Sequence, residues 1–292
     1  MASLIAVTGA SGGLGAGVAR GLAARGVPVR LVVRDVARAP RVDGAEAAVA
    51  AGYDDRAAMT AAFRGADAVL LVSGRESATR LAEHVSAVDA AVDAGVRRIV
   101  YTSFLGAAPD ATFTFARQHH HTEEHIRGTG LAWTFLRNSM YLEMVPRFAS
   151  ADGVIAGPGG DGRTAWVARD DVADVAVAVL AEDGHDRRIY EVTGPESHTL
   201  AYAAAVLARV AGRPVVYREE SIEEAYASRA GYGAPAFEVE GWVTSYVQVA
   251  RGELDVVTDV VPRLTGHAAQ RLPEFLAANP GSWAHLRPTR GG

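Results

Sequence analysis

The chain has 292 residues, 49% of them hydrophobic, and it contains no cysteine, which excludes disulfides, thiolate nucleophiles and thiolate metal sites. Its formal net charge of -5 gives no basic surface for a nucleic acid, and all 29 of its Lys+Arg residues are arginine, which excludes lysine chemistry. No apolar run is long enough for a membrane span and the N-terminus lacks a basic secretion signal, so we expect a cytoplasmic protein that binds small molecules.

Short β-branched runs alternate with alanine-rich helical patterns through the first half of the chain. The expected strands are SLIAVT, VPVRLVV, AEAAVA, DAVLLVS, RRIVYTS and LAWTFLR. Helices are expected near residues 14–25, 56–63 and 79–94, and over the histidine-rich segment FARQHHHTEEH. Continuous apolar strands separated by helices of this length predict a parallel sheet covered on both faces. The fold class is therefore α/β, a doubly wound sheet of the Rossmann type.

The pattern loosens after about residue 142. A glycine-rich segment is followed by expected helices at 170–181, 200–211 and 237–251 and by the strand RRIYEVTG. We predict a nucleotide-binding core over residues 1–142 and a mixed region over 143–280. This region completes the sheet and forms a small C-terminal substrate lobe over the carboxyl edge of the strands. Residues 281–292 are expected to be a flexible tail.

Three glycines separate the first strand from the first helix: Gly9, Gly12 and Gly15. Gly9 permits a tight turn, Gly12 lets backbone N–H groups approach a pyrophosphate, and Gly15 permits close helix packing. Their spacing is G-x-x-G-x-x-G rather than the commoner G-x-G-x-x-G. The position predicts a dinucleotide site; the alternative is a plain strand-to-helix turn.

The end of the second strand distinguishes the two nicotinamide cofactors. Arg34 stands there, with Asp35 next to it and Arg38 nearby. An arginine at this point accommodates a 2′-phosphate, whereas an acid binds a ribose 2′-hydroxyl. The sequence favours NADPH/NADP+. The alternative is that Asp35 binds the ribose and Arg34 is only a surface charge.

Several motifs together resemble one family. They are VTGASGGLG at 7–15, VRD at 33–35, VYTSFLGA at 100–107, TEEHIRGTGLAWTFLRNSMYLE at 122–143 and RDDVADVAVAVL at 169–180. The sequence resembles the NmrA-like branch of the atypical short-chain dehydrogenases/reductases, especially bacterial NAD(P)H:quinone oxidoreductases, and also aromatic polyketide ketoreductases. The resemblance implies a monomer or homodimer and a cofactor site made of Gly9, Ser11, Gly12, Leu14, Gly15, Arg34, Arg38, Ser73, Gly74 and Asn138.

The family's usual acid is missing from this chain. The wider superfamily carries a Tyr-x-x-x-Lys pair, and alignment through EEHI puts Phe115 at the tyrosine position and His119 at the lysine position. Ser103 remains as the family hydroxyl, so Ser103 and His119 are the catalytic candidates. The proton could come from His119, from water or from the substrate itself, or the protein could bind cofactor and do no chemistry.

The histidines are a poor metal site. Successive helical residues point about 100° apart, so His119, His120 and His121 cannot converge on one ion. His121 and His125 share a face, but H-T-E-E-H is not H-E-x-x-H, and we predict no metal. A flat substrate would instead find an aromatic surface; the predicted substrate-binding residues are Phe115, Met140, Tyr141, Trp166, Phe237 and Trp242.

The predicted function is an NADPH-dependent reductase. It would transfer hydride to a quinone or conjugated ketone of an aromatic small molecule, including polycyclic polyketides of antibiotic biosynthesis, without the Tyr-Lys pair. The alternative is a non-catalytic NADP(H)-binding redox sensor, because both proteins need the glycine turn and both tolerate a missing tyrosine.

Overall fold

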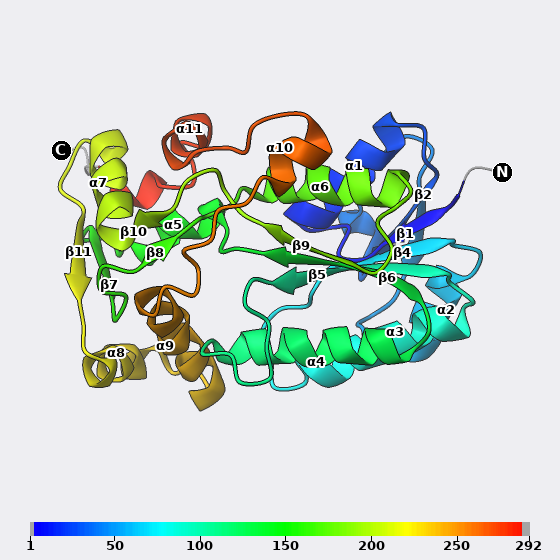
Figure 1. The fold of residues 1–292 in the computed structure, drawn as a ribbon, viewed down its shortest axis with the longest axis horizontal. Helices are drawn as coiled ribbons and strands as arrows, with labels where there is room; N and C mark the ends of the chain where they lie inside the picture. The colour runs from blue at the N-terminus through cyan, green and yellow to red at the C-terminus, as the bar shows by residue number, and fades with distance from the viewer. Residues whose placement is uncertain (1–2, 288–292) are drawn as a thin grey trace.

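The computed structural model describes residues 3–287, and its centre is a parallel sheet of seven strands. These are β1 (Ile5–Val7), β2 (Val29–Val33), β3 (Glu46–Val49), β4 (Ala68–Leu71), β5 (Arg98–Phe104), β6 (Ala132–Asn138) and β9 (Arg188–Val192). The order is β3-β2-β1-β4-β5-β6-β9, so it reverses between β1 and β4 (Figure 1). This confirms the predicted doubly wound α/β class. In such sheets ligands bind outside the carboxyl ends of the strands, where the order reverses.

Helices cover both faces of the sheet (Figure 1). The upper face carries α1 (Gly13–Ala24), α6 (Arg169–Ala181) and α10 (Val260–Thr265), and the lower face carries α2 (Arg56–Phe63), α3 (Arg80–Asp93) and α4 (Thr114–Gly128). Between these layers Val7, Leu70 and Leu136 are fully buried. Helices α1 and α6 pack very closely, because a Cβ added at Gly21 would lie 2.7 Å from Val177 Cγ2.

A small lobe lies beyond the carboxyl ends of β5 and β6 (Figure 1). It contains two-stranded sheets of β7 with β11 and of β8 with β10. Its elements are α5 (Val145–Phe148), β7 (Val154–Gly157), β8 (Arg163–Thr164), β10 (His198–Thr199), α7 (Leu200–Ala211), β11 (Val216–Glu219), α8 (Ile222–Arg229), α9 (Ala236–Ala250) and α11 (Leu272–Ala278). Short 3-10 helices are η1 (Val36–Arg38), η2 (Leu142–Met144), η3 (Ala230–Tyr232) and η4 (Ala284–Leu286).

The C-terminal segment differs from the expected tail. Trp283 donates its indole N–H to the Leu276 carbonyl (2.9 Å), and Leu286 is fully buried in the lobe core. Residues 281–287 are therefore packed against the lobe, because two large side chains anchor them; the rest of the predicted tail lies outside the described residues. Within residues 3–287 no helix combines the length and apolarity that crossing a membrane requires.

Candidate active site

The glycine turn between β1 and α1 forms the first part of the site. Gly9 has a φ of +59°, and its carbonyl accepts the Gly12 N–H at 2.9 Å. A Cβ added at Gly15 would lie only 2.5 Å from the Gly9 carbonyl oxygen. Ser11 is exposed beside the turn and Leu14 is buried behind it. No side chain caps α1 and its first turn holds no acid, so the free N–H groups are open to an anion such as a pyrophosphate.

The end of β2 presents two arginines beside this turn. Arg34 and Arg38 are exposed, and among residues 3–287 neither side chain makes a hydrogen bond or an ion pair. Asp35 accepts the Ala37 N–H at 2.9 Å and thereby caps η1. Burial raises the pKa of Tyr53 to about 12 although the Arg34 charge acts against this rise. The arrangement leaves Arg34 available to a phosphate and gives one Asp35 oxygen a structural role.

Replacement of Arg34 tests the assignment of the 2′-phosphate. We expect Arg34→Ala to raise the Kd for NADPH about 10- to 100-fold, because a charge-assisted contact contributes about 1.5–3 kcal/mol. The Kd for NADH should stay unchanged. Isothermal titration with both cofactors measures this, with Arg209→Ala on the exposed end of α7 as the control for charge. An equal loss for NADH and NADPH would contradict the assignment.

The predicted nicotinamide side of the cleft follows β4 and β6. Ser73 donates its backbone N–H to Thr102 Oγ1 (2.8 Å), and Gly74 comes directly after it. Asn138 ends β6, is 2% exposed and donates from Nδ2 to Tyr141 Oη (3.2 Å). Its Oδ1 has no hydrogen-bond partner among the described residues. A buried acceptor without a partner at this edge is suited to a ligand that donates a hydrogen bond.

Ser103 lies at the carboxyl end of β5, but its hydroxyl is already used. It donates to Glu123 Oε1 at 2.6 Å. The same carboxylate, fully buried on α4, accepts Arg137 Nε (2.9 Å) and Nη2 (2.6 Å). The hydroxyl therefore points toward α4 and its proton is held by a carboxylate. This placement differs from the expected contact with a substrate carbonyl.

His119 lies on α4 and is buried, with 5% of its surface exposed. Arg80 Nη2 lies 2.8 Å from its Nε2, and Tyr101 Oη lies 2.8 Å from its Nδ1. Burial holds the pKa of His119 well below its usual value, and the positive charge of Arg80 lowers it further. The imidazole is neutral near pH 7, so it carries no acidic proton of the kind that an imidazolium would supply.

The predicted aromatic residues fall into three groups rather than one wall. Phe115 packs between Phe113 (ring centroids 5.5 Å apart) and Phe237 (6.4 Å), and α9 approaches it closely at Gly241. Trp242 belongs with this first group because it is on the same helix as Phe237; its ring centroid lies 6.1 Å from that of Tyr232, which is 72% exposed. Met140 and Trp166 line a small enclosed cavity of about 10 Å³ in the lobe, together with Phe148, Thr164, Leu200, Ser245, Tyr246 and Val249.

Tyr141 forms the third group, on the sheet side of the lobe. The Arg169 guanidinium lies over its ring, 5.0 Å from the centroid. Burial raises the pKa of the Tyr141 hydroxyl. Of the substrate-binding candidates, Tyr141 is thus the one that the structure joins to the cofactor-binding candidate Asn138.

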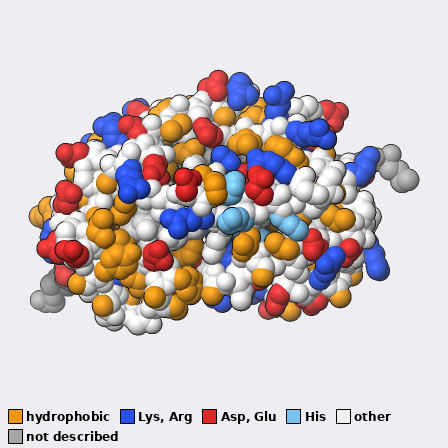
Figure 2. Space-filling view, turned by 60° about the horizontal axis from the view of Figure 1, so that its bottom comes forward, with side chains coloured by type: hydrophobic (Ala, Val, Ile, Leu, Met, Phe, Trp, Pro, Cys, Tyr) orange, Lys and Arg blue, Asp and Glu red, His pale blue; other side chains and the backbone are white. Residues whose placement is uncertain are grey.

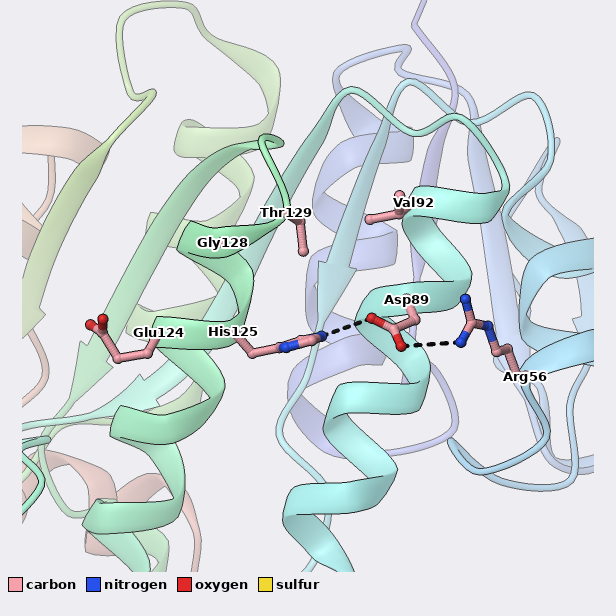
Figure 3. A pocket seen from close by; sticks show the side chains of 7 residues that line it. All are labelled: Arg56, Asp89, Val92, Glu124, His125, Gly128 and Thr129. Atoms are coloured by element: carbon pink, nitrogen blue, oxygen red, sulfur yellow. Dashed lines mark hydrogen bonds and ion pairs between the residues drawn. The ribbon is translucent and has the colours of Figure 1, made fainter.

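The remaining histidines of α4 lie toward solvent: His121 is exposed, and His120 and His125 are half-buried. Histidine side chains gather near the middle of the surface in Figure 2. His125 Nε2 lies 2.8 Å from Asp89, which also pairs with Arg56 across a surface cavity of about 420 Å³ (Figure 3). This cavity lies near the C-terminal ends of α3 and α4, at the sheet edge opposite the glycine turn. Within residues 3–287 no three His, Cys, Asp or Glu side chains cluster as metal ligands.

The sequence did not indicate five buried polar residues on α3, β5 and α4: Arg80, His84, Tyr101, Thr102 and Glu123. Arg80 and His84 are spaced one turn apart on α3, and this spacing is the one signal that joins them. An arginine or glutamate in a helix is normally exposed, so the residue types alone do not predict that these side chains are buried.

Residues 9–183 match the model of a family described as NAD(P)H-binding. The chain belongs to this family. Three curated relatives of this NAD(P)H-binding protein align over most of its length. A (4-alkanoyl-5-oxo-2,5-dihydrofuran-3-yl)methyl phosphate reductase of Streptomyces griseus is 37% identical, over 96% of this chain and 99% of the relative. Quinone oxidoreductase 2 of Escherichia coli is 34% identical and NAD(P)H azoreductase of Xenophilus azovorans 31%, each over 94% of this chain and 98% of the relative.

Two solved structures are similar to this NAD(P)H-binding protein over 94% of its chain and 99% of theirs. The NADPH complex of the Escherichia coli quinone oxidoreductase has a TM-score of 0.85 at 33% identity. The NADP(H) complex of a Citrobacter sp. triphenylmethane reductase has a TM-score of 0.82 at 30% identity. These matches confirm the expected enzyme class: the chain is an NAD(P)H-dependent oxidoreductase of the NAD(P)H-binding family.

Proposed function

We propose that this oxidoreductase uses NADPH to reduce a quinone or a conjugated ketone on a flat aromatic substrate. The observation that carries the proposal is the state of the two catalytic candidates. Ser103 donates its hydroxyl hydrogen bond to Glu123, and His119 is neutral between Arg80 and Tyr101. Neither residue offers an acidic proton, so the chemistry suits an acceptor whose reduced anion is stable without one.

The residues at the cleft fit the cofactor. The open N-terminus of α1 would hold the pyrophosphate, Arg34 and Arg38 the 2′-phosphate, and the unpartnered Oδ1 of Asn138 a donor at the nicotinamide end. When bound, NADPH supplies the hydride that the substrate accepts. The names of the similar proteins, a quinone oxidoreductase and reductases of azo and triphenylmethane compounds, support an aromatic, conjugated acceptor.

Tyr141 would act on the oxygen that gains negative charge. Its Oη accepts a hydrogen bond from Asn138, which leaves the phenol proton available to a substrate oxygen. Since burial raises the pKa of Tyr141, the hydroxyl stays protonated and donates a hydrogen bond without losing its proton. A quinone then takes up one hydride and one proton, and the proton comes from water.

We extend the proposal to polycyclic aromatic ketones of the polyketide type. A phenol next to the reacting carbonyl supplies its own proton, and the fused rings delocalise the anion. Phe237 and Trp242 of α9, which are both only partly buried, would supply apolar contacts to such a ring system, whereas Phe115 and Trp166 are buried and the cavity at Met140 is too small for it. The furanone named for the Streptomyces relative is conjugated but not aromatic, so that similarity supports the conjugated carbonyl and not the fused rings.

A substrate panel tests the proposed function. NADPH oxidation is followed by absorbance with a para-quinone, an aliphatic ketone and a polycyclic ketone that carries a neighbouring phenol, and NADH is run in parallel. We expect turnover with the quinone and the polycyclic ketone, faster with NADPH than with NADH, and none with the aliphatic ketone. Tight NADPH binding without oxidation of any panel member would favour the redox sensor instead. Rapid reduction of the aliphatic ketone would contradict the absence of an acid.

A further inference from the structure

A buried arginine lies directly beneath the turn that follows β4. Arg80, the first residue of α3, is only 3% exposed. It donates from Nε to the Gly74 carbonyl (2.9 Å), from Nη2 to His119 Nε2 (2.8 Å) and from Nη1 to Gln118 Oε1 (3.3 Å). No carboxylate within residues 3–287 pairs with it at 4.0 Å or less. Its guanidinium is thus committed to neutral groups, and two of these are on α4.

The peptide groups on both sides of Gly74 are held by α3. The Gly74 N–H donates to His84 Nε2 at 2.9 Å, while the Gly74 carbonyl accepts from Arg80. Arg80 and His84 stand one helical turn apart and therefore lie on the same face of α3. On the preceding residue, the Ser73 N–H donates to Thr102 Oγ1. Three backbone polar groups of Ser73 and Gly74 are therefore fixed by buried side chains, at the edge where the strand order reverses.

The direction of each hydrogen bond follows from the chemistry of the donors. Arginine has no acceptor, so His119 Nε2 accepts, and its proton must be on Nδ1, which donates to Tyr101 Oη. A backbone N–H also only donates, so His84 Nε2 accepts, and its Nδ1–H donates to Thr122 Oγ1 (3.0 Å). Both histidines are therefore neutral Nδ1–H tautomers, and Arg80 is the one formal charge among these groups.

We propose that Arg80 is a positioning residue for hydride transfer: it joins the Ser73–Gly74 turn to α4 through His119 and so fixes the surface against which the nicotinamide lies. The inference rests on the proposed function. It gives His119 a specific part in the site, as the neutral acceptor that orients Arg80. It also explains how a chain without lysine keeps a cation at this edge of the sheet, where the planar guanidinium of Arg80 reaches three acceptors at once.

The test separates hydride transfer from cofactor binding. In single-turnover measurements with a para-quinone, we expect Arg80→Met to slow hydride transfer by about 30-fold or more, because misplacement by about 1 Å can cost about 100-fold. The Kd for NADPH should change by less than about threefold, since the phosphate contacts at α1 and Arg34 remain. Arg80→Lys should recover only part of the rate, because an ammonium cannot make the fork geometry. Arg209→Met is the matched control for loss of an arginine.

Two readouts keep this proposal falsifiable if a variant folds poorly. Nitrogen chemical shifts of the unmodified protein must show Nδ1–H tautomers for His84 and His119, and an Nε2–H tautomer for either would overturn the network. A rate within about threefold of the parent in Arg80→Met would overturn the positioning role. If the parent protein reduces no quinone or ketone, the proposed function fails. Hydrogen exchange then tests separately whether Arg80 holds the Ser73–Gly74 turn: faster exchange of the Gly74 amide in Arg80→Lys supports this, and unchanged exchange overturns it.

Discussion

Glu123→Ala is expected to lower the free energy of unfolding by about 3–5 kcal/mol, the range for loss of one partner of a buried ion pair. The Glu123 carboxylate is fully buried and accepts from Ser103 and from two nitrogens of Arg137, and Arg127 Nη2 lies 3.4 Å away. The hydrogen bond to Glu123 also raises the pKa of Arg137. Alanine would leave the half-buried guanidinium and the Ser103 hydroxyl without their acceptor.

The neighbouring residue provides the matched control. Glu124 stands on the same helix, its side chain is 52% exposed, and its one ion pair is with Arg127. Glu124→Ala should cost less than about 1 kcal/mol, as expected of an exposed pair. Urea denaturation of both variants gives the comparison. Similar small shifts for the two would show that the Glu123 cluster does not stabilise the junction of α4 with the sheet.

Gly15→Ala is expected to raise the Kd for NADPH by about 100-fold, or about 2.7 kcal/mol. The added Cβ would lie 2.5 Å from the Gly9 carbonyl oxygen and 2.9 Å from that of Thr8, both rigid backbone atoms. The N-terminus of α1 must therefore move away from the turn, and its N–H groups no longer point at the pyrophosphate. Arg34 could not compensate, because it would contact the 2′-phosphate of the ribose and not the pyrophosphate.

Gly128→Ala controls for the loss of a glycine. It is also in a helix, and a Cβ there meets nothing within 4 Å. This variant should bind NADPH like the parent and be slightly more stable, since alanine favours helix. Titration of both variants, with melting temperatures recorded beside it, distinguishes a lost site from a lost fold. Unchanged NADPH affinity in a folded Gly15→Ala protein would be incompatible with the pyrophosphate site at this turn.

Much of the fold could be predicted because its signals are local. The helix expected at 56–63 is α2 and the one at 200–211 is α7, since each has a continuous helical pattern with a capping Asp55 or Thr199. The strands of the large sheet are equally visible as apolar runs. By contrast β7, β8, β10 and β11 have two to four residues each and no periodicity, so nothing in the sequence distinguishes them from loop.

The parts of the site that could be predicted are those fixed by their position next to a strand, without contacts to residues distant in sequence. The glycine turn and Arg34 are placed by their position after a strand. The surroundings of His119 depend on Arg80, 39 residues away, and those of Ser103 on Glu123 and Arg137. Such pairs form only when the helix packs on the sheet. The sequence therefore left His119 as one of three possible sources of the proton, whereas the structure makes it a buried neutral acceptor.

We expect that no protein group donates a proton to the reduced substrate, and the pH dependence of hydride transfer distinguishes this from proton donation by His119. The pKa of His119 is lowered, so its charged form exists only well below pH 6.5 and no acid is lost as pH rises through neutrality. Single-turnover rates with NADPH and a para-quinone should therefore vary less than about twofold between about pH 6 and 8.5. A rate that falls about tenfold per pH unit above neutrality would instead indicate a protein acid. Loss of this pH dependence in His119→Gln would show that His119 is the proton donor.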